Sequence, residues 1–219
     1  MTALPLPDFP PLRGPRDQLA RAARRLTARY TGTFGTETVE SYLEECHTLL
    51  SSRATVPTYL PVLAERFATQ RLDAIARTIG LKLKSEPEIL FVCTENAGRS
   101  QLASALLRQR VGRSVRIHSA GTLPAAWIDP VALRLMSEAG LSPGAEFPKP
   151  LTHEMVRASD IVVALGCGDA CPILPGRRYY DWNVPDLKGL DIESARSVGD
   201  ALALRVERLA IEVEREAAL

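Results

Sequence analysis

Along the first part of the chain, apolar residues recur every three or four positions, a spacing that places them on one face of a helix. Three such stripes follow one another, with short turns between them. They consist of Leu19, Ala23, Leu26 and Tyr30; of Val39, Leu43, Cys46 and Leu50; and of Leu60, Leu63, Phe67, Leu72 and Ile75. We therefore expect a three-helix bundle over residues 16–80, in which Thr36 is the N-cap of the second helix. The proline-rich residues 1–15 are expected to form an extended arm.

After residue 80 the pattern changes to short apolar runs that alternate with helical stretches. Continuous β-prone runs are typical of strands that are buried on both faces. We expect strands at 89–92, 115–118, 161–165 and 179–182, and helices at 100–110, 130–139, 152–158 and from 191 onwards. Because strands that alternate with helices favour a parallel sheet covered on both sides, residues 86–219 are predicted to form an α/β domain.

Composition disfavours several classes of protein. The chain has 219 residues, of which 46% are hydrophobic and 24% are charged, so it can bury a sizeable core. Its 27 basic and 26 acidic residues leave a net charge of +1, whereas proteins that bind nucleic acid usually carry a basic excess. No apolar run approaches the roughly 20 residues of a membrane span, and the start has no apolar signal core. We therefore expect a cytoplasmic protein that binds neither nucleic acid nor membranes.

The loop that follows the strand at 89–92 carries the candidate chemistry. Its sequence is Cys93-Thr94-Glu95-Asn96-Ala97-Gly98-Arg99-Ser100. The amides of these residues and the N-terminus of the next helix can form a cradle for a tetrahedral oxyanion, and Gly98 allows the tight curvature. Arg99 can hold two oxygens of the anion in a bidentate fork. Cys93 lies at the floor of the cradle, where positive potential favours the thiolate, which is the nucleophilic form.

Cys93 has an alternative interpretation as a packing residue, which is the common role of a free cysteine in a buried strand. The place of the loop between a buried strand and a helix, and the serine that follows Arg99, favour the anion cradle. Ser100 can donate a hydrogen bond to the thiolate, and Asn96 can pin the loop by bonding to its backbone.

Two further cysteines, Cys167 and Cys171, come directly after the strand at 161–165. The carboxyl ends of parallel strands lie at one edge of a sheet, so we expect this pair near Cys93. Zinc binding by the pair is disfavoured, because zinc needs two more ligands and no histidine has a matching spacing. We expect no metal and no cofactor. Cys46 lies on an apolar stripe and is expected to be a core residue.

The segment from Phe91 to Gln101 resembles the low-molecular-weight protein tyrosine phosphatase superfamily, and in particular its arsenate reductase branch. Ser119-Ala120-Gly121-Thr122 and a later Cys-Pro…Trp…Asp stretch also match that branch. The resemblance extends from about residue 88 to the C-terminus and implies a flavodoxin-like fold with a four-stranded parallel sheet. The bundle is similar to the three-helix domain that precedes such reductases in some actinobacterial proteins.

The resemblance also implies a general acid. Asp186 matches the aspartate that protonates the leaving group in this family. Leu187 follows it where the family usually has proline, a departure that bears on the rigidity of the loop. The alternative for Asp186 is a turn residue, since Pro185-Asp186 is common turn chemistry.

The function implied is that of an arsenate reductase, which converts arsenate to arsenite through an arseno-cysteine at Cys93. Cys167 and Cys171 match a pair that relays oxidation away from the catalytic cysteine, although the family's pair is usually further apart. Thioredoxin would reduce the final disulfide. Three alternatives stay open: an inert pair with a low-molecular-weight thiol such as mycothiol as reductant, a protein tyrosine phosphatase, and a non-enzymatic oxyanion sensor.

The role of the bundle is open at this point. It can mediate a homodimer, dock a redox partner or stabilise the α/β domain. Because all the candidate site residues lie downstream, we expect residues 1–80 to be dispensable for the chemical step. Residual phosphatase activity is also expected, since the same nucleophile, arginine and acid would serve both reactions.

Overall fold

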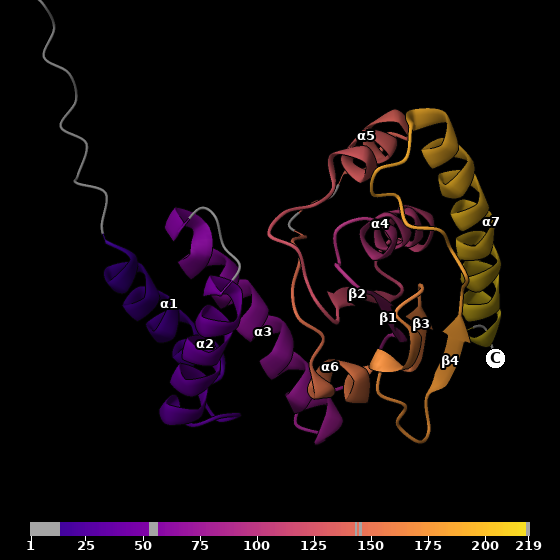
Figure 1. Ribbon diagram of the computed structural model, residues 1–219. Helices are drawn as coiled ribbons and strands as arrows, with labels where there is room; N and C mark the ends of the chain where they lie inside the picture. Colours follow the sequence, from indigo (N-terminus) through magenta and orange to yellow (C-terminus); the bar gives the residue numbers. More distant parts are fainter. Residues whose placement is uncertain (1–13, 53–56, 143, 145, 218–219) are drawn as a thin grey trace, which may run out of the picture.

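Figure 1 shows the computed structural model, in which residues 14–52, 57–142, 144 and 146–217 are described. Three helices come first: α1 (Pro15–Arg29), α2 (Thr36–Ser51) and α3 (Leu60–Thr78), the last preceded by the short 3-10 helix η1 (Pro57–Tyr59). Most residues of the predicted apolar stripes are buried. Thr36 is the first residue of α2 and not its N-cap, because Gly35 holds that position with an extended backbone. The predicted arm, residues 1–15, lies almost wholly outside the described residues.

Four strands form one sheet in which all neighbouring strands are parallel. They are β1 (Glu88–Cys93), β2 (Arg116–Gly121), β3 (Ile161–Ala164) and β4 (Arg178–Asp181), in the order β2-β1-β3-β4. The two central strands are continuous apolar runs, as expected of strands covered on both faces. The α/β, flavodoxin-like fold predicted from the sequence is therefore confirmed.

Helices cover both faces of the sheet (Figure 1). One face is covered by α4 (Arg99–Val111), α5 (Pro130–Glu138) and α7 (Ile192–Ala217), and the other by α6 (His153–Ala158) together with α3. β1 serves both cores, because successive residues of a strand point to opposite faces. Ile89 and Phe91 pack against the first layer, and Leu90 and Val92 against the second. Within the described residues, no helix is long and apolar enough to cross a membrane.

The N-terminal bundle shares a hydrophobic core with the α/β part of the chain. Phe67 and Leu72 of α3 belong to the same buried cluster as Leu90 and Val92 of β1. The bundle therefore completes the cover of one sheet face. The expectation that residues 1–80 are dispensable does not extend to folding, because their removal would expose this apolar face.

Buried ion pairs reinforce this junction. Arg77, near the end of α3, donates two hydrogen bonds of 2.9 Å to the carboxylate of Glu88 at the start of β1. Both side chains are only 2% exposed, and His118 Nε2 lies 3.0 Å from the same carboxylate. Arg71 of α3 likewise pairs with Glu154 of α6. Ion pairs therefore link α3 both to β1 and to α6.

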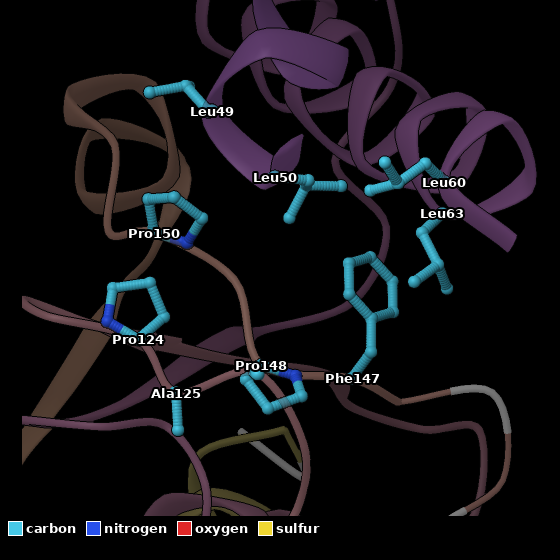
Figure 2. Close-up of a pocket in the computed structure, with 10 residues that line it drawn as sticks. Leu49, Leu50, Leu60, Leu63, Pro124, Ala125, Phe147, Pro148 and Pro150 are labelled. Carbon is cyan, nitrogen blue, oxygen red and sulfur yellow. The ribbon is translucent and has the colours of Figure 1, made fainter. Parts of the chain in front are cut away.

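Figure 2 shows a further contact between the bundle and the loops of the α/β part. Leucines of α2 and α3 face prolines and a phenylalanine from two loops, and together they line a small cavity of about 50 Å³. The labelled side chains include Leu49, Leu50, Leu60, Leu63, Pro124, Phe147 and Pro150. The loop that holds Pro124 follows β2 and also supports the candidate site described below.

Arg77→Met is expected to destabilise the whole chain. The substitution leaves the Glu88 carboxylate buried without its main partner, which costs about 3 kcal/mol in the free energy of unfolding. Urea denaturation followed by circular dichroism measures this change. Arg25→Met is the matched control, because Arg25 makes an equivalent two-pronged contact with Glu65 but is 60% exposed. Its effect should be much smaller, and equal effects of the two substitutions would contradict a structural role for the buried pair.

Candidate active site

Residues 93–99 form a loop between β1 and the start of α4, which we call the cradle loop. Its carbonyl groups are engaged on one side by the segment that follows β2. The oxygens of Cys93, Thr94, Glu95 and Ala97 accept hydrogen bonds of 2.8–3.2 Å from the amides of Thr122, Leu123, Ala125 and Asp129. In a trans peptide the N–H of the next residue points opposite to the carbonyl. The amides of Thr94, Glu95, Asn96 and Gly98 are therefore directed to the other side of the loop.

The nucleophile predicted from the sequence lies on that other side. Cys93 is 2% exposed, and its Sγ accepts a hydrogen bond of 3.2 Å from the amide of Asn96. The Ser100 hydroxyl lies 3.0 Å from the same sulfur. Because Asn96 Nδ2 donates to Ser100 Oγ at 2.9 Å, the Ser100 hydrogen is free to donate to the sulfur. The sulfur therefore has two donors directed at it, one from the backbone and one from a side chain.

The cradle loop has a positive φ at Asn96. Asn96 has a φ of 49°, whereas Gly98 has a φ of −121° and a ψ of −89°. Asparagine tolerates the left-handed region better than most residues, and here both ends of its amide are held. Its Oδ1 accepts a 3.0 Å hydrogen bond from the amide of Lys149, so the loop is pinned by a distant segment and not by its own backbone. Gln101 Nε2 donates to the Asn96 carbonyl at 3.0 Å.

Arg99, at the end of the cradle loop, turns its guanidinium towards the acid side of the site. Its side chain is almost fully buried, with Nη1 donating to the Val184 carbonyl at 3.3 Å and Nη2 donating to Asp186 Oδ2 at 2.7 Å. Its Nε is buried and has no hydrogen-bond partner among the described residues. An unsatisfied buried donor is costly, so this atom and the inward amides fit an oxyanion.

Two glycines that were not identified as site residues make room for this arrangement. A Cβ on Gly166 would lie 2.6 Å from Arg99 Nη1, and Gly166 has a φ of +67°. A Cβ on Gly121 would lie 2.7 Å from the Thr94 carbonyl oxygen. Gly121 is the last residue of β2, and Gly166 follows the end of β3 by two residues. A glycine at the end of a strand is the sequence signal that could have identified both.

Asp186, the predicted acid, lies next to the guanidinium of Arg99. It belongs to residues 182–189, which we call the acid loop, and its side chain is 49% exposed. Leu187, which stands in place of the family's proline, is completely buried and lies against Gly98 of the cradle loop. The replacement of the family's proline by Leu187 bears on the rigidity of the acid loop. Here the buried Leu187 side chain holds that loop by apolar packing against Gly98.

Cys167 and Cys171 flank the short 3-10 helix η2 (Gly168–Ala170) just after β3. Cys167 is half-buried, and its Sγ lies 3.8 Å from the carbonyl of Val92, the residue before Cys93. The interaction between the two thiols, together with burial, raises the pKa of Cys171, and the same interaction lowers the pKa of Cys167. Cys167 is therefore the more readily ionised of the two.

The remaining cysteine takes no part in the site. Cys46 on α2 is fully buried, and burial raises its pKa to about 11 in spite of the nearby Arg71. It is a core residue, as its apolar stripe predicted. In the part of the chain that the structure describes, no group of three or more His, Cys, Asp or Glu side chains is arranged to hold a metal ion.

Comparison with known families matches both parts of the chain. Residues 88–219 match the family described as low molecular weight phosphotyrosine protein phosphatase. Residues 19–76 match a family described as the N-terminal domain of protein-tyrosine-phosphatase-like proteins. Among curated proteins, arsenate reductase 1 of Staphylococcus epidermidis is 32% identical over 129 residues, which are 57% of this chain and 96% of that protein.

Solved structures agree with this placement. The thioredoxin-dependent arsenate reductase of Corynebacterium glutamicum is 42% identical, with a TM-score of 0.84, and the match covers 91% of this chain and 98% of that one. The YwlE arginine phosphatase of Geobacillus stearothermophilus is 27% identical, with a TM-score of 0.52, over 59% of this chain and 94% of that one. The first of these likenesses includes the N-terminal bundle.

Gly166→Ala is expected to weaken the binding of a tetrahedral oxyanion. The new Cβ would displace the Arg99 guanidinium, and loss of a charged hydrogen bond costs about tenfold in affinity. The measurement is the concentration of inorganic phosphate that half-protects Cys93 from alkylation by iodoacetamide.

Gly176→Ala is the matched control for this substitution. Gly176 has a φ of +75°, so alanine is strained there as well, but no atom lies within 4 Å of its Cβ position. The control should keep the protection constant of the unsubstituted protein. If both variants bind phosphate equally well, the space at Gly166 is not what positions Arg99.

Proposed function

The chain belongs to the low molecular weight phosphotyrosine protein phosphatase family, and within that family we propose that it is an arsenate reductase. One observation carries this choice over a phosphatase. Hydrolysis of a phosphate ester needs only a nucleophile, an anion site and an acid, whereas reduction also needs a second thiol. Cys167 supplies such a thiol beside the residue that precedes Cys93, and its pKa is lowered to about 7.

In the first step arsenate enters the cradle. The inward amides of the cradle loop (residues 94–98), the N-terminus of α4 that begins at Arg99 and Ser100, and the Arg99 side chain bind its oxygens. The Cys93 thiolate attacks arsenic, and one arsenic–oxygen bond breaks. Asp186 protonates the departing oxygen, which leaves as water. The 2.7 Å contact between Asp186 and Arg99 supports this role, because it puts the acid next to the group that holds the anion.

In the second step the Cys167 thiolate attacks Cys93 Sγ. The sulfur–arsenic electron pair stays with arsenic, which is thereby reduced from As(V) to As(III) and leaves as arsenite. A Cys93–Cys167 disulfide remains. Cys171 then attacks Cys167, which releases the Cys93 thiolate and leaves a Cys167–Cys171 disulfide. The proximity of these two thiols in the reduced protein supports this order.

Thioredoxin is the proposed reductant of that last disulfide. A dithiol of this kind reduces it by exchange and is itself oxidised. The support is the likeness to the Corynebacterium glutamicum enzyme, which is described as thioredoxin-dependent and which this chain matches over nearly its whole length. A low-molecular-weight thiol such as mycothiol, acting directly on the arseno-cysteine, is the alternative donor.

Arsenate-dependent NADPH consumption tests the function. The assay contains the protein, arsenate, thioredoxin, thioredoxin reductase and NADPH. Cys93→Ser should reduce the rate to background, because a hydroxyl is a far poorer nucleophile near neutral pH. Cys46→Ala removes a buried thiol outside the site and should retain turnover. Absence of arsenate-dependent turnover in the unsubstituted protein with thioredoxin and with mycothiol would reject the proposal.

Substitution of the other two cysteines separates the relay from the capture of arsenic. Cys167→Ser and Cys171→Ser should both lose repeated turnover with thioredoxin, yet both should still hydrolyse an aryl phosphate, which requires only capture by Cys93. Cys171→Ser should release arsenite once and trap a Cys93–Cys167 disulfide that mass spectrometry detects. Cys167→Ser should retain the arseno-cysteine. Normal thioredoxin-linked turnover in both variants would replace the relay by direct thiol attack.

A further inference from the structure

One ion pair joins the cradle loop to the acid loop and has no part in the chemistry described above. Lys188 Nζ donates a 2.8 Å hydrogen bond to Glu95 Oε1. Lys188 follows Asp186 by two residues, and Glu95 is the third residue of the cradle loop. The pair therefore links the loop that carries the acid to the loop that holds the anion.

Glu95 is the carboxylate that Lys188 contacts, and two further carboxylates act on its ammonium group through charge alone. The pKa of Lys188 is raised first by the hydrogen bond and charge of Glu95, and also by the charges of Asp186 and Asp129. The amide of Asp129, in the segment after β2, donates a hydrogen bond to the Ala97 carbonyl. The direct link made by Lys188 is therefore the one between the acid loop and the cradle loop.

The position of the acid indicates where a substituent on the anion must go. A general acid lies next to the oxygen that leaves, on the side of the anion away from the nucleophile. In arsenate that oxygen carries only a hydrogen, whereas in a phosphate monoester it carries the organic group. That group must leave the cradle on the side of Asp186. The Lys188–Glu95 pair joins the acid loop to the cradle loop two residues beyond that acid.

We infer that Lys188 and Glu95 form a strap that admits small tetrahedral oxyanions to the cradle and disfavours aryl phosphate esters. The inference rests on the proposed function, since it assigns that function's substrate class to two side chains. Lys188 is 65% exposed and Glu95 is 35% exposed, so the strap is a solvated ion pair that opens readily. It therefore acts as a selectivity factor of a few-fold and not as an absolute barrier.

The experiment compares two ligands that carry the same charged group. Inorganic phosphate and phenylphosphonate, an analogue of phenyl phosphate that Cys93 cannot hydrolyse, each protect Cys93 from alkylation by iodoacetamide, and mass spectrometry locates the label. The quantity of interest is the ratio of the two half-protecting concentrations. General electrostatic effects on dianion binding largely cancel in this ratio, whereas access for the phenyl group does not.

Glu95→Gln and Lys188→Met change the charge at the mouth in opposite directions, yet both break the strap. Phosphate should therefore bind more tightly to Glu95→Gln and more weakly to Lys188→Met. In both variants the preference for phosphate over phenylphosphonate should fall by about threefold, which is the scale of an exposed ion pair. The exchanged pair, Glu95→Lys with Lys188→Glu, should restore the preference. Arg134→Met breaks a comparable exposed pair on α5 and should leave it unchanged.

The outcomes separate the strap from a simple charge effect and from the proposed function. A ratio that stays constant, or that moves in opposite directions in the two variants, would overturn the strap. Failure of phosphate to protect Cys93 in the unsubstituted protein would overturn it together with the cradle. The assay measures binding and requires no turnover. If the ratio of half-protecting concentrations changes as expected but the protein does not reduce arsenate, the proposed function is refuted and the strap is supported.

Discussion

The direction of the peptide groups in the cradle loop is the constraint on which the site depends. Four carbonyls bond to the segment after β2, and planarity of the peptide then turns the following amides inward. An inward amide reaches Cys93 Sγ, and the others remain available to an anion. The anion site is therefore a consequence of how two backbone segments pair, and it places no demand on the side chains at positions 94 and 95. In this chain that freedom allows an acidic residue, Glu95, inside an anion-binding loop.

The same strand that ends at the nucleophile also joins the two layers of the molecule. Alternate residues of β1 pack against α4 and α7 on one face and against α3 and α6 on the other. The bundle therefore supports the strand that positions Cys93, and the buried contact between Arg77 and Glu88 holds its first residue. This explains how a segment with no candidate site residue of its own can matter for the site.

Local features of the site could be predicted from the sequence, and long-range ones could not. The strand, loop and helix around Cys93 are continuous in the chain, so their order, together with Ser100 after Arg99, indicated the cradle, and the family resemblance supplied Asp186 as the acid. The turn at Asn96 depends on the amide of Lys149, and the placement of Arg99 depends on the absence of a side chain at Gly166. Such contacts join residues that are more than fifty positions apart. The sequence left open whether the bundle stabilises the α/β domain, because a helical stripe shows that a face is buried but not what covers it.

Consecutive residues hold the acid loop against the cradle through different interactions, and this difference bears on the proposed mechanism. Asp186 is held by the charge of Arg99, whereas Leu187 is held by apolar packing against Gly98. An arsenate ion that binds Arg99 competes with Asp186 for the guanidinium, so binding loosens the first contact and leaves the second intact. The carboxyl group is then released from its ion pair without leaving the site. Entry of the anion therefore frees the carboxyl group from Arg99 while Leu187 keeps it beside the anion, which is the position that the proposed general acid requires.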